Sequence, residues 1–526
     1  MSFSSTPRWG FRIAAVALAI IPFILAEGLF AILGWGKPDY SEDPFIGFKK
    51  VTPLFELNEA GDAYTIQNTT KLDWFYPESF PSNKNTNTFR VFCVGGSTVA
   101  GRPYTAETAF SSWLEIYLNH NDPDRKWDVV NCGGVSYASY RLVPIVEEIV
   151  ENYQPDLIVL YTGHNEFLED RSYEHIKNLP DAVVRPYELA SKLRTFNVMR
   201  KAYAKSTGKG GPSAMETRPI LPEEVDALLE HKGGMEIYHR DPDWNASVLQ
   251  HFRYNLEAML ASTASAQVPL ILMNPSCNLA HTPPFKSEHG ANLGDHDKNE
   301  FIDLMNRASK AFRQGELNRA MELYEAAIKI DPLFAEAHYQ LGRTHDYARD
   351  YKQAYKHYID AKDLDVCPLR MLEPMHDILK EVATSEVGWI DTREEVNAIV
   401  PVSGIPGENE FLDHVHPNVG GHQFFAKLVI EEMANMALVA LTDGWLVEGG
   451  PPITPETPEE QAEELMTTFQ AKWDKSVGPS IETYLTALPE TYWEAGQERL
   501  LNVRNWARGL SQAEEPVQPR RKNTAP

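Results

Sequence analysis

The stretch that decides the fold is Val91–Gly101, VFCVGGSTVAG. The apolar run Phe89–Val94 ends in two glycines, and Ser97 and Thr98 follow at once. In an α/β fold, a strand that stops at Gly-Gly and places a serine in the next turn exposes a nucleophile at the carboxyl end of the sheet. Because many strands also end in plain Gly-Gly-Ser turns, this interpretation depends on later segments.

Strand and helix patterns alternate after this stretch. The predicted strands are Phe89–Val94, Trp127–Asn131, Leu157–Tyr161, Val268–Asn274 and Gly388–Asp391. The predicted helices are Ala109–Asn119, Leu142–Glu151, Ala246–Ala264 and Phe424–Met436. Such alternation predicts a parallel sheet between helical layers, and the unbroken LIVLY run of the third strand suits a strand buried on both faces.

The chain of 526 residues is long enough for two to four domains. We expect a transmembrane anchor at 1–35 and an irregular arm at 36–87. An α/β domain follows in two parts, 88–300 and 369–441, with a lid-like insertion at 171–245 and helical repeats at 301–368 between the parts. A helical extension with a disordered tail is expected at 442–526.

Composition narrows the class of protein. The net charge of −25 argues against a nucleic-acid partner, which requires a basic surface. Four widely separated cysteines, Cys93, Cys132, Cys277 and Cys367, have no metal-ligand spacing. We therefore expect buried free thiols and no metal or other cofactor.

The N-terminal segment Ile13–Trp35 is apolar except for Glu27, and Arg8 and Arg12 precede it. Its length suffices to cross a bilayer, and the arginines place the N-terminus in the cytoplasm and the bulk of the chain outside the inner membrane. Glu27 is expected to face a partner helix or reach the interface. A cleaved signal peptide and a buried helix of a soluble protein are the alternatives, but the run is long and no clear A-x-A site ends it.

Residues 301–368 carry an internal repeat. Small and aromatic residues recur at an offset of 34, which pairs Leu317, Ala320, Tyr324 and Ala327 with Tyr351, Ala354, Tyr358 and Ala361. This helix–turn–helix period resembles tetratricopeptide repeats, which bind protein partners. The helix expected at Leu369–Thr384 is a candidate cap for the stack, and two ordinary amphipathic hairpins are the alternative.

Four segments supply side chains suited to acyl transfer. Ser97 follows the first strand, Gly133 and Gly134 follow the second, Asn165 follows the third in GHNEF, and Asp413 and His416 lie in DHVHP. The carboxyl ends of parallel strands converge on one crevice, so residues far apart in sequence can meet there.

Each of these residues has a role in that chemistry. His416 is the candidate base for the Ser97 hydroxyl, and Asp413, three residues earlier, can orient its imidazole. The Ser97 N–H, a backbone N–H within 133–137 and the Asn165 amide are candidate donors to the oxyanion. Alone, each residue has a plainer interpretation as a turn, cap or helix-entry residue, and His164 and His414 are expected to be structural.

This ordered set resembles the SGNH (GDSL-like) hydrolase superfamily, whose serine, asparagine and histidine blocks match GGST, GHNEF and DHVHP. The resemblance implies a flavodoxin-like three-layer α/β/α domain and metal-free esterase, lipase-like or acyltransferase activity. The second block departs from the family pattern, since Ser136-Tyr137 stands where Ser-Gly is expected, and we nominate Gly134 as its donor. As a whole, the chain looks like bacterial membrane-anchored SGNH proteins that carry tetratricopeptide repeats.

Three functions follow as hypotheses. The first is a serine esterase or deacylase that acts on an acylated carbohydrate or lipid of the cell envelope. The second is an O-acyltransferase that uses the same residues with a glycan hydroxyl as acceptor. The third is a non-enzymatic scaffold, in which the repeats bind a protein partner and the hydrolase domain is degenerate.

Overall fold

The computed structural model describes residues 8–33, 35, 43, 45–169, 193–207, 219–230, 234–441 and 478–510. The chain divides into two compact units. One unit comprises residues 1–51 and 171–223, and the other comprises residues 52–170 and 224–526. Residues 442–477 and 511–526 of the predicted C-terminal extension, including its expected disordered tail, lie outside the described residues.

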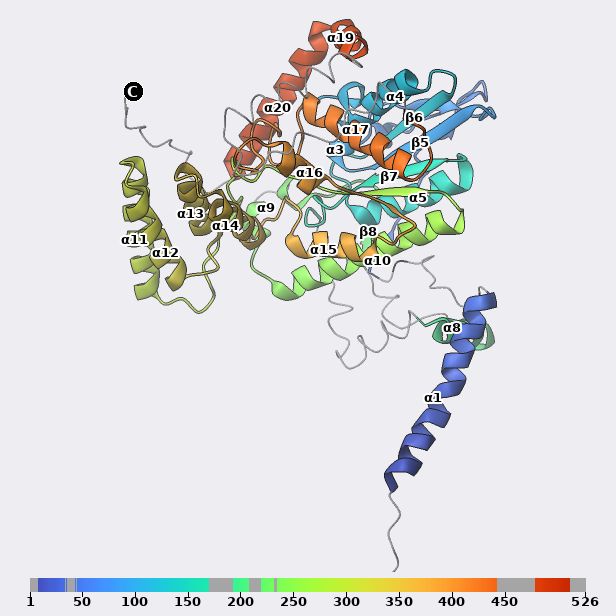
Figure 1. Ribbon diagram of the computed structural model, residues 1–526, viewed down its shortest axis with the longest axis horizontal. Coiled ribbons are helices and arrows are strands. Elements are labelled where there is room, and N and C mark those ends of the chain that lie inside the picture. The colour runs from blue at the N-terminus through green and yellow to red at the C-terminus, as the bar shows by residue number, and fades with distance from the viewer. Residues whose placement is uncertain are drawn as a thin grey trace, which may run out of the picture. The chain divides into compact units, whose positions relative to one another are not determined.

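The larger unit is built on a five-stranded parallel sheet (Figure 1) with the strand order β10-β9-β7-β5-β6. Its strands are β5 (Thr88–Gly95), β6 (Lys126–Gly133), β7 (Leu157–Tyr161), β9 (Leu270–Asn274) and β10 (Gly388–Asp391). In the register, Gly95 pairs with Gly133 on one side and with Tyr161 on the other. The predicted strands and the flavodoxin-like order, in which the first strand lies between the second and third, are confirmed.

Helices cover both faces of the sheet (Figure 1), as the predicted three-layer architecture requires. One face carries α4 (Phe110–Asn121) and α17 (Val419–Asn435), and the other carries α5 (Ser139–Asn152), α10 (Pro242–Ser265) and α15 (Glu373–Val382). Shorter elements of this unit are α2 (Thr69–Leu72), α3 (Ser97–Ala100), η1 (Ala106–Thr108), η3 (Leu228–Glu230), α9 (Gly234–Ile237) and α16 (Thr392–Ile399).

Apolar periodicity explains why α4 and α17 form this layer. Phe110, Trp113, Leu114 and Tyr117 share one face of α4 and are fully buried. They belong to one core with Phe425, Val429 and Met433 of α17 and with the inner side chains of the central strands. The four cysteines are free and buried, as expected.

The arm that precedes β5 has more regular secondary structure than predicted. Residues 56–81 form an antiparallel sheet from β2 (Glu56–Leu57), β3 (Ala63–Thr65) and β4 (Ser79–Pro81). Its aromatic side chains pack on the α/β core, where the Phe80 ring lies edge-on to the rings of Phe92 and Tyr153. The expected packing is confirmed, whereas the expected lack of regular structure is wrong because strands of two or three residues leave little periodic signal.

The repeats form two antiparallel helical hairpins between β9 and β10. The helices are α11 (Asp295–Arg313), α12 (Leu317–Ile330), α13 (Ala335–Tyr347) and α14 (Tyr351–Leu364). The recurring small and aromatic residues of α12 and α14 are buried as predicted, but α11 begins before the predicted boundary at residue 301.

The helix expected to cap the repeats has another position. α15 packs on α10 and β9 through an apolar face that includes Met375, Ile378 and Leu379, so it belongs to the layer that covers the sheet. That prediction is therefore wrong, because the apolar face of α15 completes the α/β core.

The C-terminal extension is helical, as predicted for residues 480–510. It consists of α19 (Gly478–Ala487) and α20 (Glu490–Leu510). The Tyr484 ring of α19 packs edge-on against Trp113 of α4, and the Tyr492 and Trp493 rings of α20 contact Tyr104. These aromatic contacts fasten the extension to the α/β domain.

The smaller unit contains α1 (Arg8–Leu33), α8 (Arg194–Thr207), and the paired strands β1 (Gly47–Phe48) and β8 (Ile220–Leu221). The Glu27 carboxylate of α1 accepts hydrogen bonds from the N–H groups of Arg194 and Thr195, at 2.7 and 2.8 Å, so it caps the first turn of α8. Glu27 therefore faces another helix of the same unit, and its expected place in a bilayer stays a prediction.

Within the described residues, no helix combines the length and hydropathy of a membrane-spanning segment. Much of the predicted lid-like insertion, at residues 171–192, 208–218 and 231–233, lies outside the described residues, and its role as a lid stays a prediction.

Candidate active site

Ser97 begins α3, directly after the central strand β5. The turn is tight because two glycines precede it. A Cβ on Gly95 would overlap the backbone of Tyr161, and one on Gly96 would lie 2.7 Å from the Asn165 amide nitrogen. Gly101 ends the single helical turn with a positive φ of 91°. The serine is thus held at the carboxyl edge of the sheet, as predicted.

His416 lies beside this serine. Its Nε2 is 2.7 Å from the Ser97 Oγ, and its Nδ1 is 2.6 Å from Oδ2 of Asp413. The other carboxylate oxygen of Asp413 accepts the N–H groups of Val415 and His416, each at 2.9 Å. The backbone N–H groups of the turn therefore hold the Asp413 carboxylate, and the carboxylate orients the imidazole of His416. This is the geometry of a Ser-His-Asp triad.

The surroundings keep Asp413 ionised. Burial opposes ionisation, but the neighbouring His416 and His414 and the hydrogen bonds to the carboxylate hold the pKa of Asp413 well below its usual range. Burial lowers the pKa of His414 to about 4, although the Asp413 charge opposes this shift. Burial also lowers the pKa of His164 to about 3, with smaller contributions from His414 and His416. Both of these neutral rings fit the predicted structural role.

Asn165, in the GHNEF segment after β7, lies near Ser97 as predicted. One hydrogen of its side-chain amide is used, because Nδ2 donates to the Tyr137 carbonyl at 2.9 Å. An amide has two N–H groups, so the second can face a ligand. Gly96 carries no Cβ that would separate this amide from the Ser97 turn. The amide is therefore suited to donate to an oxyanion next to Ser97.

The N–H of Gly134, nominated above, is already engaged. It donates to the Gly95 carbonyl at 2.9 Å and so extends the β5–β6 ladder beyond its last residue pair. The N–H groups of Val135 and Tyr137 donate to Trp74 and Gly134 carbonyls. Ser136 has a positive φ of 63°, and its N–H donates to no group in the described chain. Ser136 is therefore the better-placed second-block donor, and the role of Gly134 stays a prediction.

Comparisons with known proteins agree with part of this picture. A tetratricopeptide-repeat family model matches residues 310–345. Comparison with curated proteins gives no match. Among solved structures, similar chains include an α/β hydrolase from the metagenome of Lake Arreo, Spain (13% identity, TM-score 0.28), and a catalytic mutant of an acetylxylan esterase from Geobacillus stearothermophilus (14%, 0.28). Each alignment covers 66% of this chain, and 95% and 94% of those chains.

A protein from Desulfitobacterium hafniense, assigned to the lipolytic G-D-S-L family, has 11% identity and a TM-score of 0.25 over 65% of this chain and 98% of its own. The blocks GGST, GHNEF and DHVHP meet at one edge of a sheet whose strand order is the one that the resemblance implies. The α/β domain is interrupted between β9 and β10 by the helical repeats, part of which matches the tetratricopeptide-repeat model.

The repeats support the DHVHP segment of the α/β domain through the segment that follows β9. Asn278 donates its backbone N–H to the His414 carbonyl at 3.0 Å and its side-chain amide to the Asp413 carbonyl at 3.2 Å. Tyr339 of α13 donates its hydroxyl to the Ala280 carbonyl at 3.0 Å in the same segment. The turn that carries Asp413 and His416 and the second repeat therefore share one support.

The sequence did not indicate that α20 borders the site around Ser97 and His416. Arg499 donates to the Pro103 carbonyl at 2.6 Å, in the loop after the Ser97 turn, and Arg504 donates to the Leu412 carbonyl at 2.9 Å, next to Asp413. The aromatic residues at 492–493 could have indicated that this helix packs on the rest of the protein, because such side chains on a helix usually lie on a packed face.

Proposed function

We propose that this protein is a serine esterase or deacylase that removes an ester-linked acyl group from a carbohydrate or lipid of the cell envelope. The observation that carries the proposal is the chain of two short contacts, from Ser97 Oγ to His416 Nε2 at 2.7 Å and from His416 Nδ1 to Asp413 at 2.6 Å. Those contacts supply what a serine needs to become a nucleophile at neutral pH, namely a base in hydrogen-bond reach and a carboxylate that orients it.

In the proposed reaction, the Ser97 oxygen attacks the ester carbonyl carbon while His416 takes the hydroxyl proton. Asp413 stabilises the imidazolium that results. The N–H of Ser97, the N–H of Ser136 and the Asn165 amide donate to the oxyanion. His416 then returns the proton to the leaving alcohol, and an acyl group remains on Ser97. Water repeats these steps, with His416 again as base, and releases the acid.

The direct test uses a short-chain aryl ester and a fluorophosphonate probe. The wild-type chain should hydrolyse the ester and be labelled at Ser97, whereas Ser97→Ala should lose both properties and keep its circular dichroism spectrum. The matched control is Ser112→Ala on α4, outside the set of candidate catalytic residues, which should retain both. Full turnover by a folded Ser97→Ala variant would refute the proposal.

The same assay separates hydrolysis from the alternative O-acyl transfer. An acceptor polysaccharide is added with the acyl donor, and the acyl group is traced by mass spectrometry. Free acid as the main product supports the esterase, and an acylated glycan supports the transferase. The scaffold alternative would be favoured if Ser97→Ala preserved function in vivo while deletion of 301–368 abolished it.

The envelope location remains part of the proposal. It is supported by the apolar sequence at 13–35 behind two arginines and by exposed apolar side chains along α1, among them Phe23, Leu25 and Ile32, which are 61%, 67% and 85% exposed. Alkaline extraction of cell membranes tests it. The full chain should stay in the membrane pellet, and a chain without residues 1–35 should be released.

A further inference from the structure

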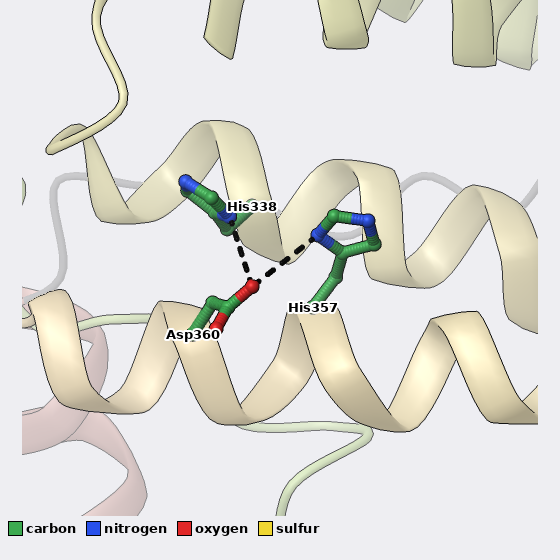
Figure 2. Close-up of side chains that lie close together, drawn as sticks. All are labelled: His338, His357 and Asp360. Carbon is green, nitrogen blue, oxygen red and sulfur yellow. Dashed lines mark ion pairs between the residues drawn. The ribbon is translucent and has the colours of Figure 1, made fainter.

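Two histidines and an aspartate meet in the second repeat, away from the triad. His338 is on α13, and His357 and Asp360 are on α14 (Figure 2). Asp360 Oδ2 lies 3.6 Å from His338 Nδ1 and 3.7 Å from His357 Nδ1. One ligand atom from each residue lies within 4.8 Å of the others. The cluster therefore offers two imidazole nitrogens and one carboxylate oxygen to a single point.

The His338 ring is oriented by its second nitrogen. Its Nε2 lies 3.1 Å from the Pro332 carbonyl, which can only accept, so Nε2 carries the proton. The lone pair of the neutral ring is then on Nδ1, which points toward Asp360 in Figure 2. A backbone carbonyl that fixes the tautomer in this way is the usual outer partner of a metal-bound histidine.

The two Nδ1 atoms also lack ordinary partners. Both are buried and, within the described chain, neither makes a hydrogen bond. His338 is only 8% exposed, so water does not readily replace the missing partner. The ring of His357 is further held by His345, which stacks on it with centroids 5.7 Å apart and an interplanar angle of 12°. The oriented acceptor of His338 and the unsatisfied Nδ1 of His357, both facing a carboxylate, are what a cation would satisfy.

We propose that His338, His357 and Asp360 bind a divalent transition-metal ion, for which Zn²⁺ is the best match. Zinc accepts imidazole nitrogen and carboxylate oxygen in a tetrahedral arrangement, with bonds of about 2.0–2.2 Å that place ligand atoms roughly 3.3–3.5 Å apart. The separations of 3.6 and 3.7 Å between Asp360 Oδ2 and the two Nδ1 atoms are within a few tenths of an ångström of these values. Asp360, with a side chain 34% exposed, leaves an approach for the ion and a water ligand.

The bound ion would join α13 to α14 and would take no part in the ester chemistry. Lys356 already forms an exposed ion pair with Asp360 at 3.2 Å, and the metal has to displace it from that oxygen. Exposed pairs contribute little, so the displacement is easy. The same two helices hold Tyr339 and Tyr358 in the cluster that includes Val415, next to His416. The ion therefore stabilises the repeat that supports the catalytic turn.

Calorimetric titration of the chelator-treated full chain with ZnCl₂ tests the proposal. We expect one high-affinity Zn²⁺ per chain and a higher melting temperature with the metal. His338→Gln and His357→Gln should each weaken binding at least tenfold and abolish the melting shift. Added Co²⁺ should give the visible absorption bands of a tetrahedral complex in the wild type and not in these variants.

The matched control is His296→Gln, because His296 is an exposed histidine of α11. It should bind Zn²⁺ as the wild type does. Asp360→Asn alters a partly exposed side chain and carries the test if a histidine variant fails to fold; it should also weaken binding at least tenfold. No saturable binding by the wild type, or equal affinity in the wild type and folded variants, would overturn the proposal.

Discussion

His416 Nε2 lies 2.7 Å from the Ser97 Oγ, although 319 positions separate the two residues along the chain. Hydrogen bonds of neighbouring residues hold both Ser97 and His416 in place. Thr98, the residue after the serine, approaches the Val415 carbonyl next to the histidine at 3.5 Å. On the other side of the turn, Asn278 binds the carbonyls of Asp413 and His414. The triad therefore depends on a network that joins β5, the segment after β9 and the histidine block.

Asp413→Asn should leave the turn folded and nearly abolish turnover. The amide oxygen can still accept the N–H groups of Val415 and His416, but an amide beside Nδ1 no longer stabilises the imidazolium or the correct tautomer. We expect kcat for a short-chain aryl ester to fall about 10³–10⁴-fold, with a small change in melting temperature. A kcat within threefold of the wild type would contradict the role of Asp413.

Asn165→Ala should lower kcat about 10²–10³-fold with little effect on KM, because an oxyanion donor acts in the transition state rather than on bound substrate. Steady-state kinetics on the same ester measure both constants. The matched control is Asn121→Ala, since the Asn121 amide binds the Ala440 carbonyl at 2.9 Å away from the triad. Equal losses of kcat in the two variants would indicate a structural effect and no oxyanion role.

Gly496→Ala should loosen α20 from the α/β domain. A Cβ at this position overlaps the Tyr104 ring, and overpacking of this kind costs about 1–3 kcal/mol. That loss exceeds the ~1 kcal/mol that alanine gains over glycine in a helix. We expect a lower melting temperature and faster proteolysis within 478–510. Glu494→Ala, an exposed change on the same helix, should leave both unchanged, and an equally stable Gly496→Ala variant would refute the packing argument.

His422 should make the protein sensitive to acid. Burial lowers its pKa to about 3, and the charge of His416 is a smaller cause. Below pH ~6.5 this ring binds a proton in the unfolded chain and not in the folded chain. Protonation therefore favours unfolding in that range and has no effect on stability at higher pH. The free energy of unfolding therefore falls by about 1.4 kcal/mol per pH unit from pH ~6.5 toward pH 3.

Urea unfolding of the wild type and of His422→Leu at pH 7 and pH 5 measures this effect. Between the two values, the wild type should lose about 2 kcal/mol more than the variant. Parallel losses in wild type and His422→Leu would contradict the prediction.

The sequence by itself determined the strands, the blocks and the repeats of this protein. The runs at 89–94 and 157–161 and the 34-residue offset between α12 and α14 are local or periodic signals, and side-chain burial in a parallel sheet or a helical hairpin produces them directly. The order of GGST, GHNEF and DHVHP then indicated one site, because parallel strands end at a common edge.

Only the tertiary structure decided which groups complete the sites. The Gly134 N–H is taken by Gly95 through an extended ladder, which leaves Ser136 as the second-block candidate. α20 borders the site around Ser97 and His416, and His338 meets His357 and Asp360. In each case the partners come from separate elements, and long-range packing and hydrogen bonds bring them together. Such contacts leave no periodic trace in the local sequence.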